Sequence, residues 1–158
     1  MIELVIPGTP KALKRHRHTR TGHTYDPSKQ DKQDLLKIVL SQAGTPYPGS
    51  SVETSMPPVS ISVIFYMPRP KSHYRTGKFS GLLRDDAPDL HTNKPDLTNL
   101  LKLVEDALEA HFYRNDSQIF NITAWKVYDE NPRTEITLDF HKSDKAYERR
   151  VDDIGAEA

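Results

Sequence analysis

The chain has 158 residues, and its 22 basic and 22 acidic side chains give a formal net charge of zero. One domain is the default for this length, which is sufficient to bury a hydrophobic core. Because the chain contains no cysteine, disulfides and thiolate zinc sites are excluded. No apolar run approaches the ~20 residues of a membrane span, and the N-terminus lacks the pattern of a secretion signal. We therefore expect a cytoplasmic protein without a membrane partner.

The charges are distributed unevenly along the chain. Residues 10–24 contain five basic side chains and no acid, and a second basic stretch occupies residues 69–84. Neutrality of the whole chain argues mildly against a nucleic-acid partner, but local basic stretches suit a surface that binds phosphates. The candidate DNA contacts are Lys11, Lys14, Arg15, Arg17, Arg20, Arg69, Lys71, Arg75 and Lys78.

The first predicted strand covers Ile2–Ile6 and ends at a Pro-Gly pair. A basic segment follows, with a predicted turn at Arg20-Thr21-Gly22. His16 and His18 alternate in this segment as on a strand, but no cysteine or matching carboxylate set lies nearby. A contact with DNA backbone therefore explains the segment better than a zinc site, and a solvated loop remains an alternative.

A helix is predicted from a cap at or just before Ser28 to about Ala43, where a glycine follows. A loop rich in Pro, Gly and Ser covers residues 45–58. Apolar residues then alternate over Val59–Tyr66, which predicts a strand with one buried face. Residues 68–93 form a long loop, and loops of this length in a small domain indicate either a functional or a disordered segment.

The next predicted helix has two contrasting faces. Pro95 lacks a backbone donor and suits the start of a helix, and Asp96 is a good N-cap because its carboxylate can accept from first-turn amides. The apolar arc faces the predicted core and consists of Leu97, Leu100, Leu101, Val104, Ala107, Leu108 and His111. The opposite arc consists of Thr98, Asn99, Lys102, Glu105, Asp106 and Glu109.

The polar arc allows two interpretations. The first is a solvated face with ordinary pairs such as Lys102 with Asp106. The second uses the turn at residues 112–118, which can fold Asp116 back toward the same surface. Carboxylates that converge with a lysine are costly unless a cation lies among them. Magnesium accepts a few carboxylates, keeps waters and binds phosphate oxygens, so the pattern predicts a magnesium site against a phosphodiester.

Two further segments are predicted to be strands, over Ile119–Tyr128, where side chains alternate between the two faces, and over Thr134–Phe140. The turn between them predicts an antiparallel hairpin. Strands and helices together predict a mixed sheet of about four strands with two main helices packed on it, in the α/β or α+β class. Residues 1–141 are predicted to form one domain, and residues 142–158 a flexible tail.

Three segments carry a resemblance to the RusA family of Holliday-junction resolvases: Pro95-Asp96-Leu97-Thr98-Asn99-Leu100-Leu101-Lys102, Asp106-Ala107-Leu108 and Asn115-Asp116-Ser117-Gln118-Ile119. The resemblance is dense over residues 94–119 and looser from the first strand to about residue 140. We therefore assign the fold as α+β (mixed α/β) and RusA-like. The resemblance implies a homodimer that binds four-way branched DNA and makes paired cuts with Mg²⁺ or Mn²⁺.

Carried over residue by residue, the resemblance implies three catalytic residues. Asp96 and Asp116 would bind the metal, and Lys102 would contact the scissile phosphate or stabilise charge that develops there. Thr98 and Asp106 are the lesser candidates for the metal site.

The chain departs from the family pattern at two positions. Asn115 stands where the family has an aspartate, which is a mild change. Thr98 replaces a second aspartate, and its hydroxyl can ligate magnesium but lacks the charge. Either Asp106 or Glu105 compensates, or the enzyme is weakened, or it is inactive. One alternative is therefore a junction-binding protein that has lost cleavage, and another is an unrelated interaction domain with a solvated acidic face.

Overall fold

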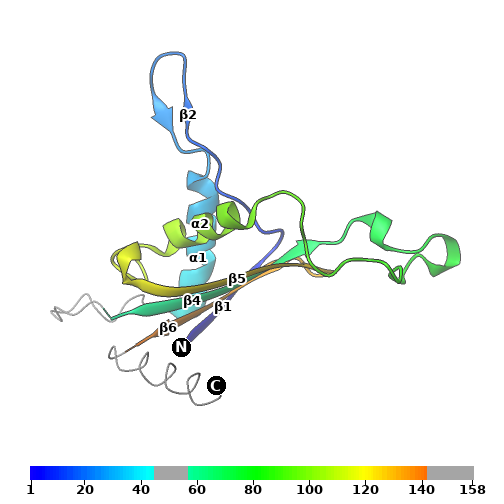
Figure 1. The fold of residues 1–158 in the computed structure, drawn as a ribbon. Helices are drawn as coiled ribbons and strands as arrows, with labels where there is room; N and C mark the ends of the chain where they lie inside the picture. Colours follow the sequence, from blue (N-terminus) through cyan, green and yellow to red (C-terminus); the bar gives the residue numbers. More distant parts are fainter. Residues whose placement is uncertain (45–56, 142–158) are drawn as a thin grey trace, which may run out of the picture.

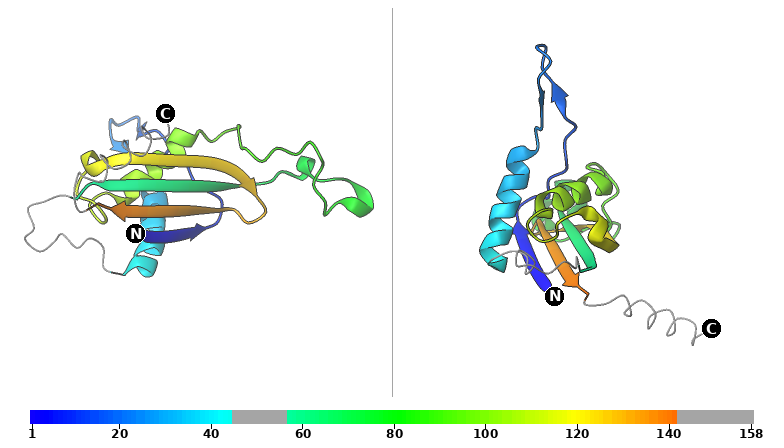
Figure 2. Two further views of the ribbon diagram at one scale, coloured as in Figure 1. Left: turned by 60° about the horizontal axis from the view of Figure 1, so that its bottom comes forward. Right: turned by 90° about the vertical axis from the view of Figure 1, so that its left-hand side faces the viewer.

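The computed structural model describes residues 1–44 and 57–141. One mixed sheet holds four strands in the order β1-β6-β4-β5, namely β1 (Ile2–Pro7), β4 (Val59–Pro68), β5 (Ile119–Asp129) and β6 (Arg133–Phe140). The helices α1 (Lys29–Ala43) and α2 (Leu97–Leu108) both lie on one face of this sheet (Figure 1). The opposite face of the sheet is turned to the viewer in the left panel of Figure 2. The predicted α+β fold, with a four-stranded mixed sheet and two helices, is confirmed.

Two segments project from this body (Figure 1). The ribbon, residues 15–25, contains the short antiparallel strands β2 (Arg17–His18) and β3 (Thr24–Tyr25). Its turn is closed by hydrogen bonds between residues 19 and 23, so the turn predicted at Arg20-Thr21-Gly22 is confirmed. The arm, residues 69–93, contains the short 3₁₀ helices η1 (Lys71–His73) and η2 (Gly77–Phe79), and a third, η3 (Asp116–Gln118), precedes β5.

β4 is the central strand of the apolar core. It pairs in parallel with β5 and antiparallel with β6. Its alternate side chains are buried against the helices, and these are Val59, Ile61, Val63, Phe65 and Met67. β-branched and aromatic residues suit such a pleated surface, so the predicted strand with one buried face is confirmed.

The predicted antiparallel hairpin of residues 119–128 with 134–140 is wrong, because β4 lies between β5 and β6. The link between the two strands passes the end of β4, where the last pairs are Pro68 with Asp129 and Tyr66 with Arg133. Pro68 has no N–H to donate to a ladder, and β4 ends there. The residues of the turn after β5 determine only that the chain reverses direction there. The alternating apolar residues of β4 favour this strand for the centre of the sheet.

Both predicted helices are present, but their caps differ from expectation. Ser28 occupies the N-cap position of α1 without a capping bond, and its buried hydroxyl accepts instead from the Lys14 N–H at 2.8 Å. Gly44 ends α1 with a φ of 70°, which favours glycine. Asp96 occupies the N-cap position of α2, and its carboxylate also makes no capping bond.

Two sequence predictions fall largely on residues that are not described. The loop over residues 45–58 lies outside the described residues except at its last two positions, and the tail over residues 142–158 lies outside them entirely. Among the residues that the structure describes, no helix is long and apolar enough to cross a membrane.

Replacement of a buried β4 side chain should destabilise the domain far more than replacement of its neighbour on the other face. Ile61→Ala removes a side chain that is 1% exposed, and we expect a loss of about 2–5 kcal/mol in the free energy of unfolding. The control Ser62→Ala, at an exposed position, should change it by less than ~0.5 kcal/mol. Urea unfolding measures both, and equal losses would contradict this assignment of the two faces.

Candidate functional site

The polar face of α2 contains the predicted pair of Lys102 with Asp106. Their nitrogen and oxygen atoms lie 3.2 Å apart, one helical turn along α2. Asp106 also lies 4.0 Å from Lys32 of α1, and Lys32 in turn pairs with Asp26. Asp106 is thus shared between two lysines and helps to join the helices, which makes it the weakest of the predicted metal ligands.

Asp116 comes close to this face of α2. Partial burial disfavours the charged form of Lys102, but the hydrogen bond and charge of Asp106, with Glu105 and Asp116 beyond it, outweigh burial and raise the pKa of Lys102. Burial raises the pKa of the Glu105 carboxyl, and the negative charges of Asp106 and Asp116 add to this effect while Lys102 opposes it. The structure therefore brings Lys102, Glu105, Asp106 and Asp116 into one electrostatic cluster.

The η3 turn explains why Asp116 is held where it is. The Asn115 side chain accepts from the Ser117 N–H at 2.8 Å, while the Gln118 side chain accepts from the Asn115 N–H at 3.2 Å. Together they form a capping box, and Gln118 is buried. Asparagine caps as well as aspartate does, so the departure at Asn115 preserves the turn that presents Asp116.

A second tie connects this turn to α2. Tyr113 is fully buried, and its hydroxyl donates to the Glu105 carbonyl at 2.8 Å. Burial, together with the surrounding carboxylates, raises the pKa of Tyr113, so the phenol stays neutral and keeps its donor. The position of Asp116 relative to Lys102 is thus fixed by contacts on both sides of the turn.

Asp96 and Thr98 lie in the first turn of α2, and both are exposed. Because the Asp96 carboxylate makes no capping bond, it is not engaged with the first-turn amides. The carbonyl of Asn99 in the same turn accepts from the Leu13 N–H at 2.9 Å. The segment that leads into the ribbon is therefore attached directly to the predicted site.

The donor types around α2 suit a hard cation. Carboxylates and a threonine hydroxyl are oxygen ligands of the kind that magnesium prefers, and magnesium usually keeps several waters. In residues 1–44 and 57–141, however, no group of three or more Asp, Glu or His side chains is close enough to share an ion. The types of these donors fit magnesium by their chemistry, but the described residues do not form a closed set of ligands.

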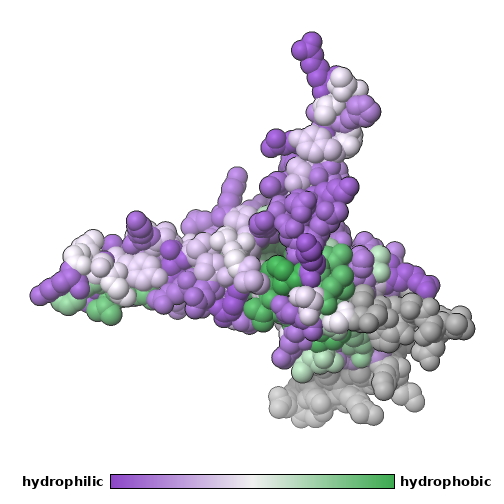
Figure 3. All heavy atoms as spheres, turned by 180° about the vertical axis from the view of Figure 1, so that it is seen from behind, coloured by the Kyte–Doolittle hydropathy of each residue, from purple (hydrophilic) through white to green (hydrophobic). Residues whose placement is uncertain are grey.

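The structure divides the predicted DNA contacts of the N-terminal segment into two groups. Lys11 and Lys14 both pair with Asp31, at 2.7 and 3.5 Å, and thereby fasten this segment to α1. Arg15, Arg17 and Arg20 are exposed on the ribbon. Figure 3 shows that hydrophilic residues cover most of the ribbon and the arm. The structure thus engages the two lysines in ion pairs with α1, whereas the three arginines lie along the ribbon.

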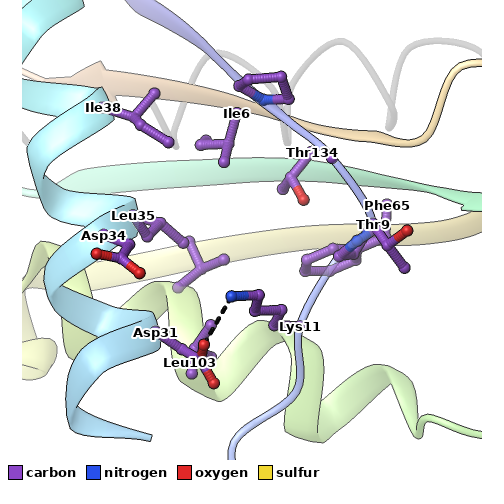
Figure 4. A pocket seen from close by; sticks show the side chains of 14 residues that line it. Ile6, Thr9, Lys11, Asp31, Asp34, Leu35, Ile38, Phe65, Leu103 and Thr134 are labelled. Carbon is purple, nitrogen blue, oxygen red and sulfur yellow. Dashed lines mark hydrogen bonds and ion pairs between the residues drawn. The ribbon is translucent and has the colours of Figure 1, made fainter.

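The pair of Lys11 with Asp31 borders a small cavity between α1, α2 and the end of β1 (Figure 4). The cavity has a volume of about 90 Å³, and Leu35, Phe65 and Leu103 contribute to its lining. Small-molecule sites usually occupy about 300–1,000 Å³. This cavity is therefore too small to be the candidate site, and we assign it to packing.

The arm has a defined structure, which replaces the long structureless loop predicted for residues 68–93. Its two limbs are joined by the Arg75 N–H to the Leu82 carbonyl at 2.8 Å and by the Arg84 N–H to the His73 carbonyl at 2.9 Å. An ion pair of Arg75 with Asp85 at 2.9 Å reinforces them. Lys71, Arg75 and Lys78 are exposed along the arm.

Arg69 differs from the other predicted DNA contacts. Its guanidinium donates to the Pro88 carbonyl and the Asp89 carboxylate, both at 2.8 Å, and lies over the Tyr128 ring. The side chain is only 7% exposed. Arg69 therefore closes the base of the arm through these contacts, and its predicted contact with DNA stays a prediction.

Sequence reasoning missed Lys126. Its ammonium donates to the carbonyls of Asn93 and Pro95, each at 2.6 Å, immediately before Asp96. The one signal in the sequence is its place in β5, on the side of the strand that also carries Phe120, Ile122 and Ala124. A lysine at such a position needs buried acceptors, and the sequence does not show that a distant loop supplies them.

Comparison with known proteins gives two matches. Residues 7–139 match the family model described as endodeoxyribonuclease RusA. A protein of Bacillus subtilis (strain 168), named uncharacterized protein YqaN, is 33% identical over 145 residues, which cover 87% of this chain and 94% of that protein. The family match includes all the candidate site residues.

The Asp31 carboxylate gives a pH-dependent contribution to stability. The hydrogen bond from Lys11, assisted by the charges of Lys11 and Lys14, lowers its pKa below the ordinary 3.8. A lowered carboxyl pKa contributes stability above the ordinary value and loses it as the pH falls through the folded value. We expect Asp31→Asn to lower the free energy of unfolding at pH 7 by up to about 1 kcal/mol. Urea unfolding should show that this difference disappears at acid pH, and an undiminished difference there would exclude the mechanism.

Proposed function

The chain belongs to the RusA endodeoxyribonuclease family, and from this premise we propose that it is a magnesium-dependent endonuclease that resolves four-way (Holliday) DNA junctions by paired strand cuts. The observation that carries the proposal is the Lys102–Asp106 pair on the polar face of α2, with the charge of Asp116 near enough to help raise the pKa of Lys102. The uncapped carboxylate of Asp96 stands at the start of the same helix. Carboxylates beside a protonated lysine are what phosphodiester hydrolysis with a divalent cation requires.

In the proposed reaction, Asp96 and Asp116 hold the divalent ion, with Thr98 as a neutral neighbour. When bound, the ion polarises the phosphate and lowers the pKa of a coordinated water. Lys102 keeps its proton because its pKa is raised. It donates toward the non-bridging oxygens and offsets the charge that develops on them. Manganese, which takes the same oxygen ligands, replaces magnesium in this scheme.

The ribbon and the arm supply the proposed DNA contacts. The ribbon segment is attached to the first turn of α2 at Asn99, and the arm runs directly into the same helix. Contacts with phosphates position a duplex without reading its sequence. The exposed basic groups are therefore suited to selecting a branched shape, and they are Arg15, Arg17, Arg20, Lys71, Arg75 and Lys78.

We further propose that the enzyme acts as a homodimer. A four-way junction has approximate two-fold symmetry, and a two-fold dimer matches it with one site for each of two opposing strands. Paired cuts follow from that symmetry, because each protomer meets an equivalent phosphate.

Thr98 favours a second candidate, a junction-binding protein with weakened or lost cleavage. It replaces the family's aspartate in the first turn of α2, and the described residues contain no group of three carboxylates that could share an ion. A site with fewer negative charges binds a divalent cation less tightly. The two candidate functions differ in whether the protein cleaves the junction, and both use the same DNA-binding surface.

The principal test is cleavage of a labelled four-way junction in magnesium, with a linear duplex of the same sequence beside it. We expect nicking of the junction alone, and a fall of more than about 100-fold with Asp116→Asn, because a metal ligand is removed. Asp139→Asn on β6 is the matched control and should nick at the native rate. Equal nicking by the two variants would refute the role of Asp116, and binding without nicking would favour the second candidate.

Thr98→Asp tests whether the native site is weakened. The added carboxylate should strengthen magnesium binding, so we expect nicking at limiting magnesium to rise about 10-fold or more. Thr98→Asn, which keeps the size without the charge, is the control and should give no such rise. A magnesium titration of the initial rate measures the effect, and no gain from Thr98→Asp would show that the missing charge does not limit the enzyme.

A further inference from the structure

Lys126 occupies an unusual position for a lysine. It is paired in register with Phe65 of the central strand, and Phe65 is buried beneath the helices. Lys126 itself is partly buried, and an ammonium removed from water is costly unless its donors are satisfied. Here two donors meet the carbonyls of Asn93 and Pro95 at 2.6 Å each. The side chain is therefore committed to one short stretch of backbone.

The main chain of Lys126 contacts the other end of the same stretch. Its carbonyl accepts from the His91 N–H at 3.0 Å. We call residues 91–95 the connector, because they join the arm to α2. Lys126 thus contacts the connector at its first residue through the backbone and at its third and fifth residues through the side chain. A single residue of β5 clamps the whole connector.

The connector has no regular secondary structure of its own. Besides Lys126, the Asn93 side chain donates to the Tyr128 hydroxyl at 3.2 Å, and the Tyr128 N–H donates to the Asp89 carbonyl at 2.8 Å. These contacts all lead to β5. The path of the connector is therefore set by hydrogen bonds to one strand, and the ammonium of Lys126 makes the two shortest of them.

The connector ends at Asp96. Asp96 has extended dihedral angles, with φ −69° and ψ 140°, and its carbonyl accepts from the Asn99 and Leu100 N–H groups at 3.1 Å each. Because its own side chain makes no capping bond, the place of its carboxylate depends on the backbone before and after it. The helix fixes one side of Asp96, and the connector fixes the other.

We propose that Lys126 is a positioning residue for the reaction. It holds the connector so that the Asp96 carboxylate keeps one fixed place at the start of α2, the helix that also carries Lys102. It also makes the placement of Asp96 depend on how the arm is docked on β5. The inference rests on the proposed function, because the role of Asp96 comes from it.

A positioning role for Lys126 can be separated from two simpler roles by the measured quantities that its substitution changes. A lysine that binds DNA would affect junction affinity, and a lysine that only stabilises the fold would affect the midpoint of thermal unfolding. A positioning lysine changes the catalytic rate constant and the magnesium requirement, with little change in junction affinity. Displacement of a reacting group by about 1 Å costs on the order of 100-fold in rate.

The experiment compares the full-length native chain with Lys126→Met, which keeps the stem and removes the donors. Lys126→Arg keeps the charge but changes the geometry of the donors. Lys37→Met, at an exposed position on α1, is the matched control. Each protein is assayed for single-turnover junction nicking, for junction affinity without metal, and for hydrogen exchange of the amides at residues 93–100.

We expect Lys126→Met to nick about 100-fold more slowly at saturating junction and to need about 10-fold more magnesium. Junction affinity should stay within about 2-fold, and exchange in residues 93–100 should quicken. Lys126→Arg should show the same signature in milder form, and it serves as the test if the Met variant does not fold. Lys37→Met should match the native chain throughout.

Three results would overturn the proposal. They are unchanged nicking in both Lys126 variants, a loss of junction affinity that accounts for the loss of rate, and unchanged hydrogen exchange with a slower rate. Failure of the proposed function is recognised separately, because the native chain would then leave the junction intact. The exchange measurement still tests the clamp in that case.

Discussion

The two-faced character of α2 is the constraint on which the rest of the structure depends. At about 100° per residue, its apolar arc must lie on the sheet, and Leu100, Val104 and Leu108 are fully or almost fully buried there. That packing turns Lys102 and Asp106 outward. The same helix therefore packs against the core with one face and carries the charged cluster on the other. Because both faces share one backbone, the rigidity of the core extends to the candidate site.

Three contacts attach the elements around the site to α2. The turn before Asp116 is joined by the Tyr113 hydroxyl to the Glu105 carbonyl, and the segment before the ribbon by the Leu13 N–H to the Asn99 carbonyl. Lys32 adds an ionic link from α1 to Asp106. These contacts connect the start of α2 to the segment before the ribbon, and its last turns to α1 and to the turn before Asp116. The segment before the ribbon and the turn that carries Asp116 therefore keep a defined relation to α2.

The sequence predicts those features that depend on local chemistry. The arcs of α2, the alternation of β4 and the ribbon turn follow from residue spacing and turn residues, and the structure contains all three. The sequence did not reveal that β4 lies between β5 and β6, because the pairing of strands that are far apart in the chain has no local signal. The same limit hid the acceptors of Lys126, the burial of Arg69 and the sharing of Asp106. In each case the partner lies far away in the chain, and only the fold brings it near.

The sheet order also has a consequence for how the chain reaches its native state. β6 is bonded to β1 on one side and β4 on the other, with Ile2 opposite Leu138 and Val63 opposite Ile136. The sheet thus closes only when the first and last described strands meet, and such a high contact order slows folding. During synthesis β4, the most apolar strand, leaves the ribosome long before β6 does. Its edge toward β6 therefore stays unpaired for that interval, and an unpaired apolar edge is a template for aggregation.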